Sequence, residues 1–122
     1  MPRQGANHDT HADGLVGELM LGAEATSRGC TAFYPVGGNV AAIDLMVITP
    51  SNRRLTVQVK CQSTANRRTV DLGKSDKSNL DVVAVFHAGE GWFLVPAKKV
   101  GDKRTIRISE IGEYHNNWRL LR

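Results

Sequence analysis

Three polar side chains in apolar segments are the first candidates for chemistry. Asp44 falls inside the apolar run AAIDLMVIT, and Gln58 and Lys60 lie in the next valine-rich run, LTVQVK. Successive side chains of a strand point to opposite faces, so Val57 and Val59 share one face while Gln58 and Lys60 share the other. The spacing Asp-x13-Gln-x-Lys predicts that two adjacent strands bring a carboxylate, an amide and an ammonium into one small site.

Such a site suits a divalent metal ion. The carboxylate supplies the hard oxygen ligand that Mg²⁺ prefers, and a lysine beside the metal would orient water or offset charge that develops on a phosphate. Two structural explanations stay open from these residues alone. A Q-x-K triplet occurs by chance in many strands, and a single buried aspartate is often only a hydrogen-bonded structural residue.

A helix is predicted ahead of these strands, over about residues 11–28. Gly29 stands where a left-handed C-terminal cap is expected. One face of the helix is apolar, and we expect this face to pack on the core; it consists of Leu15, Val16, Leu19, Met20 and Ala23.

The interior of this helix contains three glycines, each of which costs roughly 1 kcal/mol relative to alanine. Close approach of another segment is the expected reason for Gly14, Gly17 and Gly22. Glu18 lies between Gly14 and Gly22 on one i, i+4 row, away from the centre of the apolar stripe. The helix alone also allows a solvent-facing glutamate beside flexible glycines.

The rest of the chain is rich in predicted strands. Residues 62–79 are polar, basic and too irregular for an assignment, and residues 109–122 favour a terminal helix or turn. Trp92, Phe93 and Trp118 are expected in the core. One domain over residues 1–122 is predicted, with a flexible N-terminus over residues 1–9. Strands are expected within residues 31–36, 41–49, 55–61, 81–87, 92–96 and 104–109.

Charge is distributed unevenly along the chain. The net charge is +4, but residues 1–50 hold two basic residues against five acids, and residues 51–122 hold fourteen against seven. A basic surface of this kind suits a polyanion, although a solvated face kept for solubility is the alternative. The cations nearest the candidate site in sequence are expected to contact phosphate: Arg53, Arg54, Arg67, Arg68, Lys74 and Lys77.

The N-terminal segment and the apolar runs of the chain bear on the cellular compartment of the protein. It has no apolar signal segment, and no run is long enough to cross a bilayer, so a cytoplasmic protein is expected. Cys30 and Cys61 are expected to be free thiols.

Several short motifs, taken in order, resemble the PD-(D/E)xK nuclease superfamily. The resemblance is to its small Gln-bearing members, such as group I intron homing endonucleases and small phage and bacterial endonucleases. The residues that carry it are Gly17-Glu18, Arg28-Gly29, Tyr34-Pro35, Ile43-Asp44-Leu45, Val57-Gln58-Val59-Lys60, Asp81-Val-Val-Ala-Val85 and Trp92-Phe-Leu-Val-Pro96.

The resemblance implies an α/β, restriction-endonuclease-like fold, a mixed β-sheet flanked by helices. It implies that Glu18 and Asp44 bind Mg²⁺ with the Val59 carbonyl, that Mn²⁺ substitutes, and that Gln58 and Lys60 complete the catalytic set. Ile43 replaces the proline of the motif, which carries no chemistry. Gln58 removes one formal charge from the metal ligands, which leaves altered metal affinity or lost activity as alternatives.

A metal-dependent DNA endonuclease that hydrolyses phosphodiesters is therefore expected. One small domain offers one site and duplex DNA has two strands, so a homodimer or homotetramer is the natural assembly. Two alternatives remain: a structure-selective enzyme similar to Holliday-junction resolvases, and a catalytically inactive DNA-binding module that keeps the nuclease fold.

Overall fold

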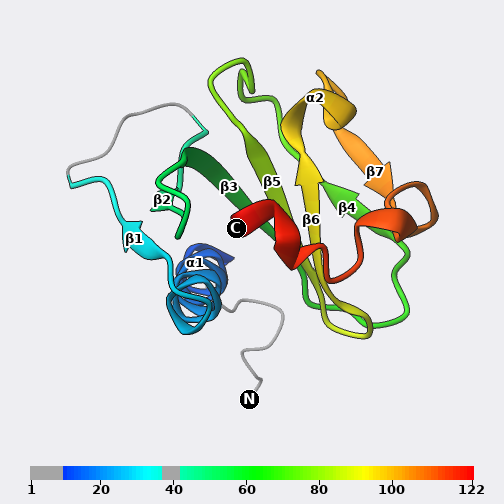
Figure 1. Ribbon diagram of the computed structural model, residues 1–122. Coiled ribbons are helices and arrows are strands. Elements are labelled where there is room, and N and C mark those ends of the chain that lie inside the picture. Colours follow the sequence, from blue (N-terminus) through cyan, green and yellow to red (C-terminus); the bar gives the residue numbers. More distant parts are fainter. Residues whose placement is uncertain (1–9, 37–41) are drawn as a thin grey trace.

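The computed structural model describes residues 10–36 and 42–122 and contains a mixed five-stranded sheet (Figure 1). The strand order is β1-β2-β3-β5-β6, in which only β3 and β5 pair in parallel. A second sheet pairs β4 with β7. The elements are α1 (Thr10–Ser27), β1 (Thr31–Phe33), β2 (Leu45–Ile48), β3 (Arg54–Gln62), β4 (Thr69–Asp71), β5 (Val82–His87), β6 (Gly91–Pro96), α2 (Ala97–Val100), β7 (Thr105–Arg107) and three 3₁₀ helices, η2 (Ile108–Glu110), η3 (Gly112–Tyr114) and η4 (Trp118–Leu121).

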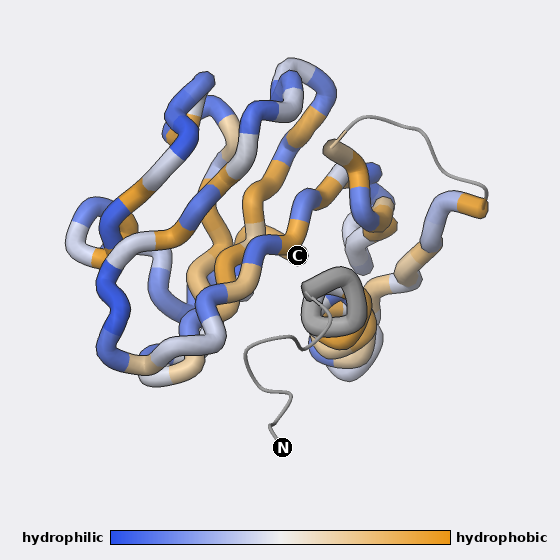
Figure 2. Tube along the Cα trace, turned by 180° about the vertical axis from the view of Figure 1, so that it is seen from behind, coloured by the Kyte–Doolittle hydropathy of each residue, from blue (hydrophilic) through white to orange (hydrophobic). Residues whose placement is uncertain are grey.

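The large sheet is covered on both faces. On one face α1 and η4 pack on Leu45, Val57 and alternate residues of the other strands. On the opposite face β4, β7 and α2 pack on Val83 and Val85. Burial on both sides explains why β5 and β6 are continuous apolar runs, and Figure 2 shows this hydrophobic colour along the strands in the middle of the molecule.

The predicted mixed α/β class and most of the predicted elements are confirmed. The helix over residues 11–28 is α1, and Gly29 follows it with φ +90°. The strand predicted within residues 104–109 is β7. Its partner β4 lies within residues 62–79, for which no element was predicted. Residues 109–122, for which a terminal helix or turn was predicted, form short 3₁₀ helices. The proposed flexible segment 1–9 lies outside the described residues.

The predicted orientation of α1 is wrong. Leu15, Val16, Leu19 and Met20 are exposed, with 38–54% of each surface accessible, whereas Leu21 and Ala25 are buried against the sheet. Ala23 is exposed as well. The small residues turn toward the sheet because they allow the helix axis to come closer to β3 than a leucine stripe would.

Two of the three helix glycines have the close contact predicted for them. A Cβ at Gly17 would overlap Cys61 Sγ on β3 and lie 3.4 Å from Val59 Cγ1, and a Cβ at Gly22 would overlap the Tyr34 hydroxyl. At Gly14 no atom of the described residues lies within 4 Å of that position. Gly17 therefore sets how closely α1 approaches β3.

Within the described part of the chain, none of the helices has the length and apolar character needed to cross a membrane.

Candidate active site

Asp44 lies at a fork where β2 begins and the preceding chain turns away from β3. Its N–H donates to the Val57 carbonyl at 2.8 Å. Its carboxylate accepts the Val59 N–H at 2.7 Å. The Asp44 carboxylate thus accepts the N–H that a backbone carbonyl would accept if the pairing of β2 with β3 continued. Asp44 is therefore held to β3 at two points, and its carboxylate has a defined position.

Glu18 reaches the same fork from α1. The close contact at Gly17 holds this turn of the helix against Val59 and Cys61. The Tyr34 hydroxyl donates to the Glu18 carbonyl at 3.1 Å. The Glu18 side chain lies close enough to the Asp44 carboxyl group to lower its pKa through a hydrogen bond. The structure thus joins two acids that are 26 positions apart in sequence.

Burial of the Asp44 carboxyl raises its pKa. The Val59 N–H, the charge of Lys60 and the hydrogen bond with Glu18 each act in the opposite direction, but burial is the largest effect. Two carboxyl groups in contact in a partly buried place share a proton or bind a cation, because both cannot ionise there without cost. A perturbed pKa with specific charged partners is typical of functional sites.

Gln58 and Lys60 lie on the sheet face opposite α1. The β2–β3 register ends at the pair Leu45–Val57, and Asp44 and Gln58 are the next residues of the two segments beyond that pair. Gln58 is 3% exposed, and its Oε1 is buried without a hydrogen-bond partner among the described residues. An unsatisfied buried oxygen costs about 1–3 kcal/mol, so its retention favours a bound ligand or cation.

Lys60 is half-buried and lies beside the Asp44 carboxyl group closely enough to influence its pKa. Its Nζ would be 3.5 Å from a Cβ at Gly73, the residue that follows β4 by two positions. Gly73 has φ +74°, a conformation that glycine adopts readily, so the loop passes the ammonium with no side chain between them.

The oxygen atoms at the fork fit a hard divalent cation. The described residues contain no cluster of three His, Cys, Asp or Glu residues that could hold a metal, so neutral oxygens must complete any such site. The N–H and C=O of one strand residue point to the same edge, so the Val59 carbonyl points to the fork with its N–H. Together with the carboxyl groups of Glu18 and Asp44, this carbonyl offers oxygen ligands of the kind that Mg²⁺ prefers.

The six predicted phosphate-contacting cations are not in one place. The Arg53 guanidinium donates to the Leu120 and Arg122 carbonyls at 2.8 and 2.9 Å, so it anchors the C-terminal segment within the fold. Arg54 begins β3 and is exposed, and Arg67 is exposed beyond its other end.

Arg68 is ion-paired with Glu90 at 2.9 Å. Lys74 and Lys77 line a cavity that Gly73 joins to the surroundings of Lys60. Sequence reasoning missed Arg104 and Lys98, which line the same cavity. Arg104 is brought near Lys74 by the pairing of β4 with β7, which no local pattern signals, and Lys98 is contributed by α2.

Comparison with solved structures identifies a similar fold in a bacterial homing endonuclease, I-Ssp6803I. The TM-score is 0.72 with 17% sequence identity, and the match covers 92% of this chain and 91% of that one. No protein-family model matches the chain, and no curated protein does. The likeness therefore shows the fold.

We expect Asp44→Asn to raise the free energy of unfolding at pH 7. The folded-state pKa of Asp44 is raised, so the folded chain holds that proton more tightly than the unfolded chain. The stabilisation that this bound proton contributes is complete below about pH 4, and it is lost as the pH rises through the folded-state pKa. Asparagine keeps an oxygen for the Val59 N–H and does not ionise, so its advantage should shrink at low pH. Urea unfolding in EDTA at both pH values measures the difference.

Asp76→Asn is the matched control. The backbone N–H and the hydroxyl of Ser78 lower the pKa of this exposed carboxyl, so the substitution should lower stability at pH 7 and have little effect at low pH. An Asp44→Asn protein less stable than wild type at pH 7 in EDTA would contradict the account of Asp44.

Proposed function

We propose that this protein is a metal-dependent DNA endonuclease that hydrolyses phosphodiester bonds. The observation that carries the proposal is the carboxyl pair of Glu18 and Asp44 at the fork, with Lys60 beside it. The similar fold of a homing endonuclease supports the same activity. The basic excess in residues 51–122 supports nucleic acid as the substrate.

Mg²⁺ is the proposed cofactor, with Mn²⁺ as a substitute. Glu18, Asp44 and the Val59 carbonyl would hold it, and Gln58 Oε1 would serve as a further oxygen ligand or hold a coordinated water. When bound, the ion supplies Lewis acidity and lowers the pKa of water. Binding a dication also removes the cost of keeping two carboxylates together, which is the reason that the apo site should accept it.

The side chains of this chain have separate tasks. The Val59 N–H fixes one oxygen of Asp44, and the carboxylate would offer its other oxygen to the ion. Glu18 is held by a helix that cannot rotate away from β3 without separating the Gly17 contact. Lys60 carries the positive charge that offsets the negative charge developing on the phosphoryl oxygens as water attacks phosphorus and the P–O bond breaks.

Cleavage in Mg²⁺ tests this proposal on linear, nicked and four-way DNA. We expect Lys60→Ala to lower the rate by roughly 10²-fold with little change in the melting temperature, because one oriented charge is lost at the reacting phosphate. Lys99→Ala, at an exposed residue of α2, is the matched control and should cleave like wild type. EDTA should stop cleavage by the wild type.

The other outcomes separate the alternatives. Cleavage confined to four-way DNA would identify a structure-selective nuclease, and salt-sensitive DNA binding without cleavage in Mg²⁺ or Mn²⁺ would identify an inactive module. Equal rates for Lys60→Ala and Lys99→Ala would refute the proposed role of Lys60.

We also propose that the protein is a homodimer, or a tetramer built from such dimers, through the outer face of α1. Four large apolar side chains of this face are exposed: Leu15, Val16, Leu19 and Met20. Phe33, on the edge strand β1, and Tyr34, which follows that strand, are also exposed. An uncharged stripe of this kind is self-complementary, so two copies can meet about a two-fold axis without bringing like charges together.

Light scattering at micromolar concentration tests the assembly. Leu19→Lys places a charge in the middle of the stripe and should shift the protein to monomer, whereas Ser109→Lys, at an exposed residue outside this face, should leave the assembly unchanged. A monomeric wild type, or a Leu19→Lys protein that assembles normally, would contradict the interface.

A further inference from the structure

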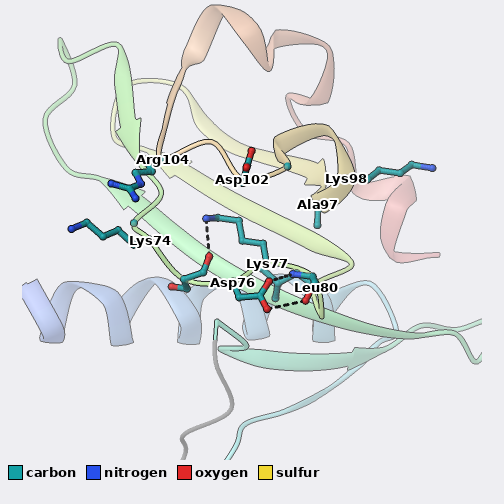
Figure 3. Close-up of a pocket in the computed structure, with 12 residues that line it drawn as sticks. Lys74, Asp76, Lys77, Leu80, Ala97, Lys98, Asp102 and Arg104 are labelled. Carbon is teal, nitrogen blue, oxygen red and sulfur yellow. Dashed lines mark hydrogen bonds between the residues drawn. The ribbon is translucent and has the colours of Figure 1, made fainter.

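A basic cavity lies between the loop after β4 and the segment that joins α2 to β7. It has a volume of about 580 Å³ and is lined by four cationic side chains and two acidic ones. Figure 3 shows Lys77 crossing the cavity toward the side where Lys74 and Arg104 lie, while Lys98 extends the opposite way. Lys77 therefore points toward the end of the cavity that Lys74 and Arg104 line.

Lys77 is the unusual member of this group. It is 8% exposed, and its Nζ has one hydrogen bond among the described residues, to the Ser75 carbonyl at 3.3 Å. A lysine ammonium can donate three hydrogen bonds, and a buried charge is costly unless it is paired. No carboxylate of the described residues lies within ion-pairing distance of it. The geometry leaves donors of Lys77 directed into the cavity.

Among the described residues, the acids of the cavity form no ion pair with its cations, and the charge of Lys77 is the smallest of the effects on the lowered pKa of Asp76. The Asp76 carboxylate is occupied by the Ser78 N–H at 2.9 Å and the Ser78 hydroxyl at 3.0 Å. Within the described residues, Asp102 forms no ion pair with Lys74, Lys77 or Arg104. The four cationic residues of the lining therefore outnumber its two acids, and this excess of positive charge favours an anion.

We propose that this cavity binds a backbone phosphate of the DNA strand that is cut at the fork. The inference rests on the proposed function and names a contact of the same substrate. Gly73 links the two places, because it lines the cavity and also lies beside the Lys60 ammonium. Gly73 places no side chain between the cavity and the Lys60 ammonium. Lys77, Lys74 and Arg104 would hold the phosphate and so fix the register of the strand over the fork.

The test measures DNA binding in EDTA, so that it does not depend on cleavage. Fluorescence anisotropy of a mixed-sequence duplex is followed between about 50 and 200 mM salt for wild type, Lys77→Met, Arg104→Gln and the control Lys99→Met. Methionine keeps most of the length of Lys77 without its charge. We expect Lys77→Met and Arg104→Gln each to reduce the salt slope by roughly one unit, and Lys99→Met to keep the wild-type slope.

A second arm uses inorganic phosphate in place of DNA, with the amide signals of residues 73–78 followed by NMR. Signals that shift with DNA at far lower concentration than with phosphate support a strand contact.

Phosphate binding abolished by Lys77→Met, with unchanged DNA salt slopes, would overturn the proposal and leave a site for a free anion. Wild-type slopes for both Lys77→Met and Arg104→Gln would also overturn it. If Lys77→Met folds poorly, Lys74→Met replaces it with the same expected change. If the salt slopes change as expected but the wild-type protein does not cleave DNA in Mg²⁺, the proposed endonuclease activity is refuted and the phosphate contact stands.

Discussion

The hydrogen bond from the Val59 N–H to the Asp44 carboxylate holds the fork on which the proposed chemistry depends. At 2.7 Å it is a short bond to an ionisable acceptor, a type that contributes about 1.5–3 kcal/mol. It joins the start of β2 to the middle of β3 where the backbone ladder between them ends. The same contact brings the carboxyl group out of water, so the structural bond and the raised pKa have one origin.

The position of α1 is the second condition for the site. Gly17 allows the helix to approach β3, and Glu18 then reaches Asp44. This arrangement has a consequence on the other side of the helix. A helix that turns its small residues toward the sheet must turn Leu15, Val16 and Leu19 outward. The site and the exposed apolar face thus result from one choice of helix orientation.

The parts that sequence could predict are those with a local pattern. Alternation along LTVQVK placed Gln58 and Lys60 on one face, and the costly Gly17 indicated a close contact of the helix. The orientation of α1 could not be predicted from its hydrophobic stripe, because the helix packs by close approach instead of by apolar area. The convergence of Lys77 and Arg104 depends on two three-residue strands, which are too short to leave a pattern.

The central claim is that the fork binds a divalent cation, and a crystal structure grown with Mn²⁺ tests it most directly. We expect an anomalous density peak for a Mn²⁺ ion that is coordinated by carboxylate oxygens of Glu18 and Asp44. The Val59 carbonyl or Gln58 Oε1 should also lie in the coordination sphere of that ion. Asp44→Asn crystals grown in the same way should lack or weaken that peak. A wild-type structure in which Glu18 and Asp44 remain hydrogen-bonded to each other, with no Mn²⁺ between them, would contradict the account.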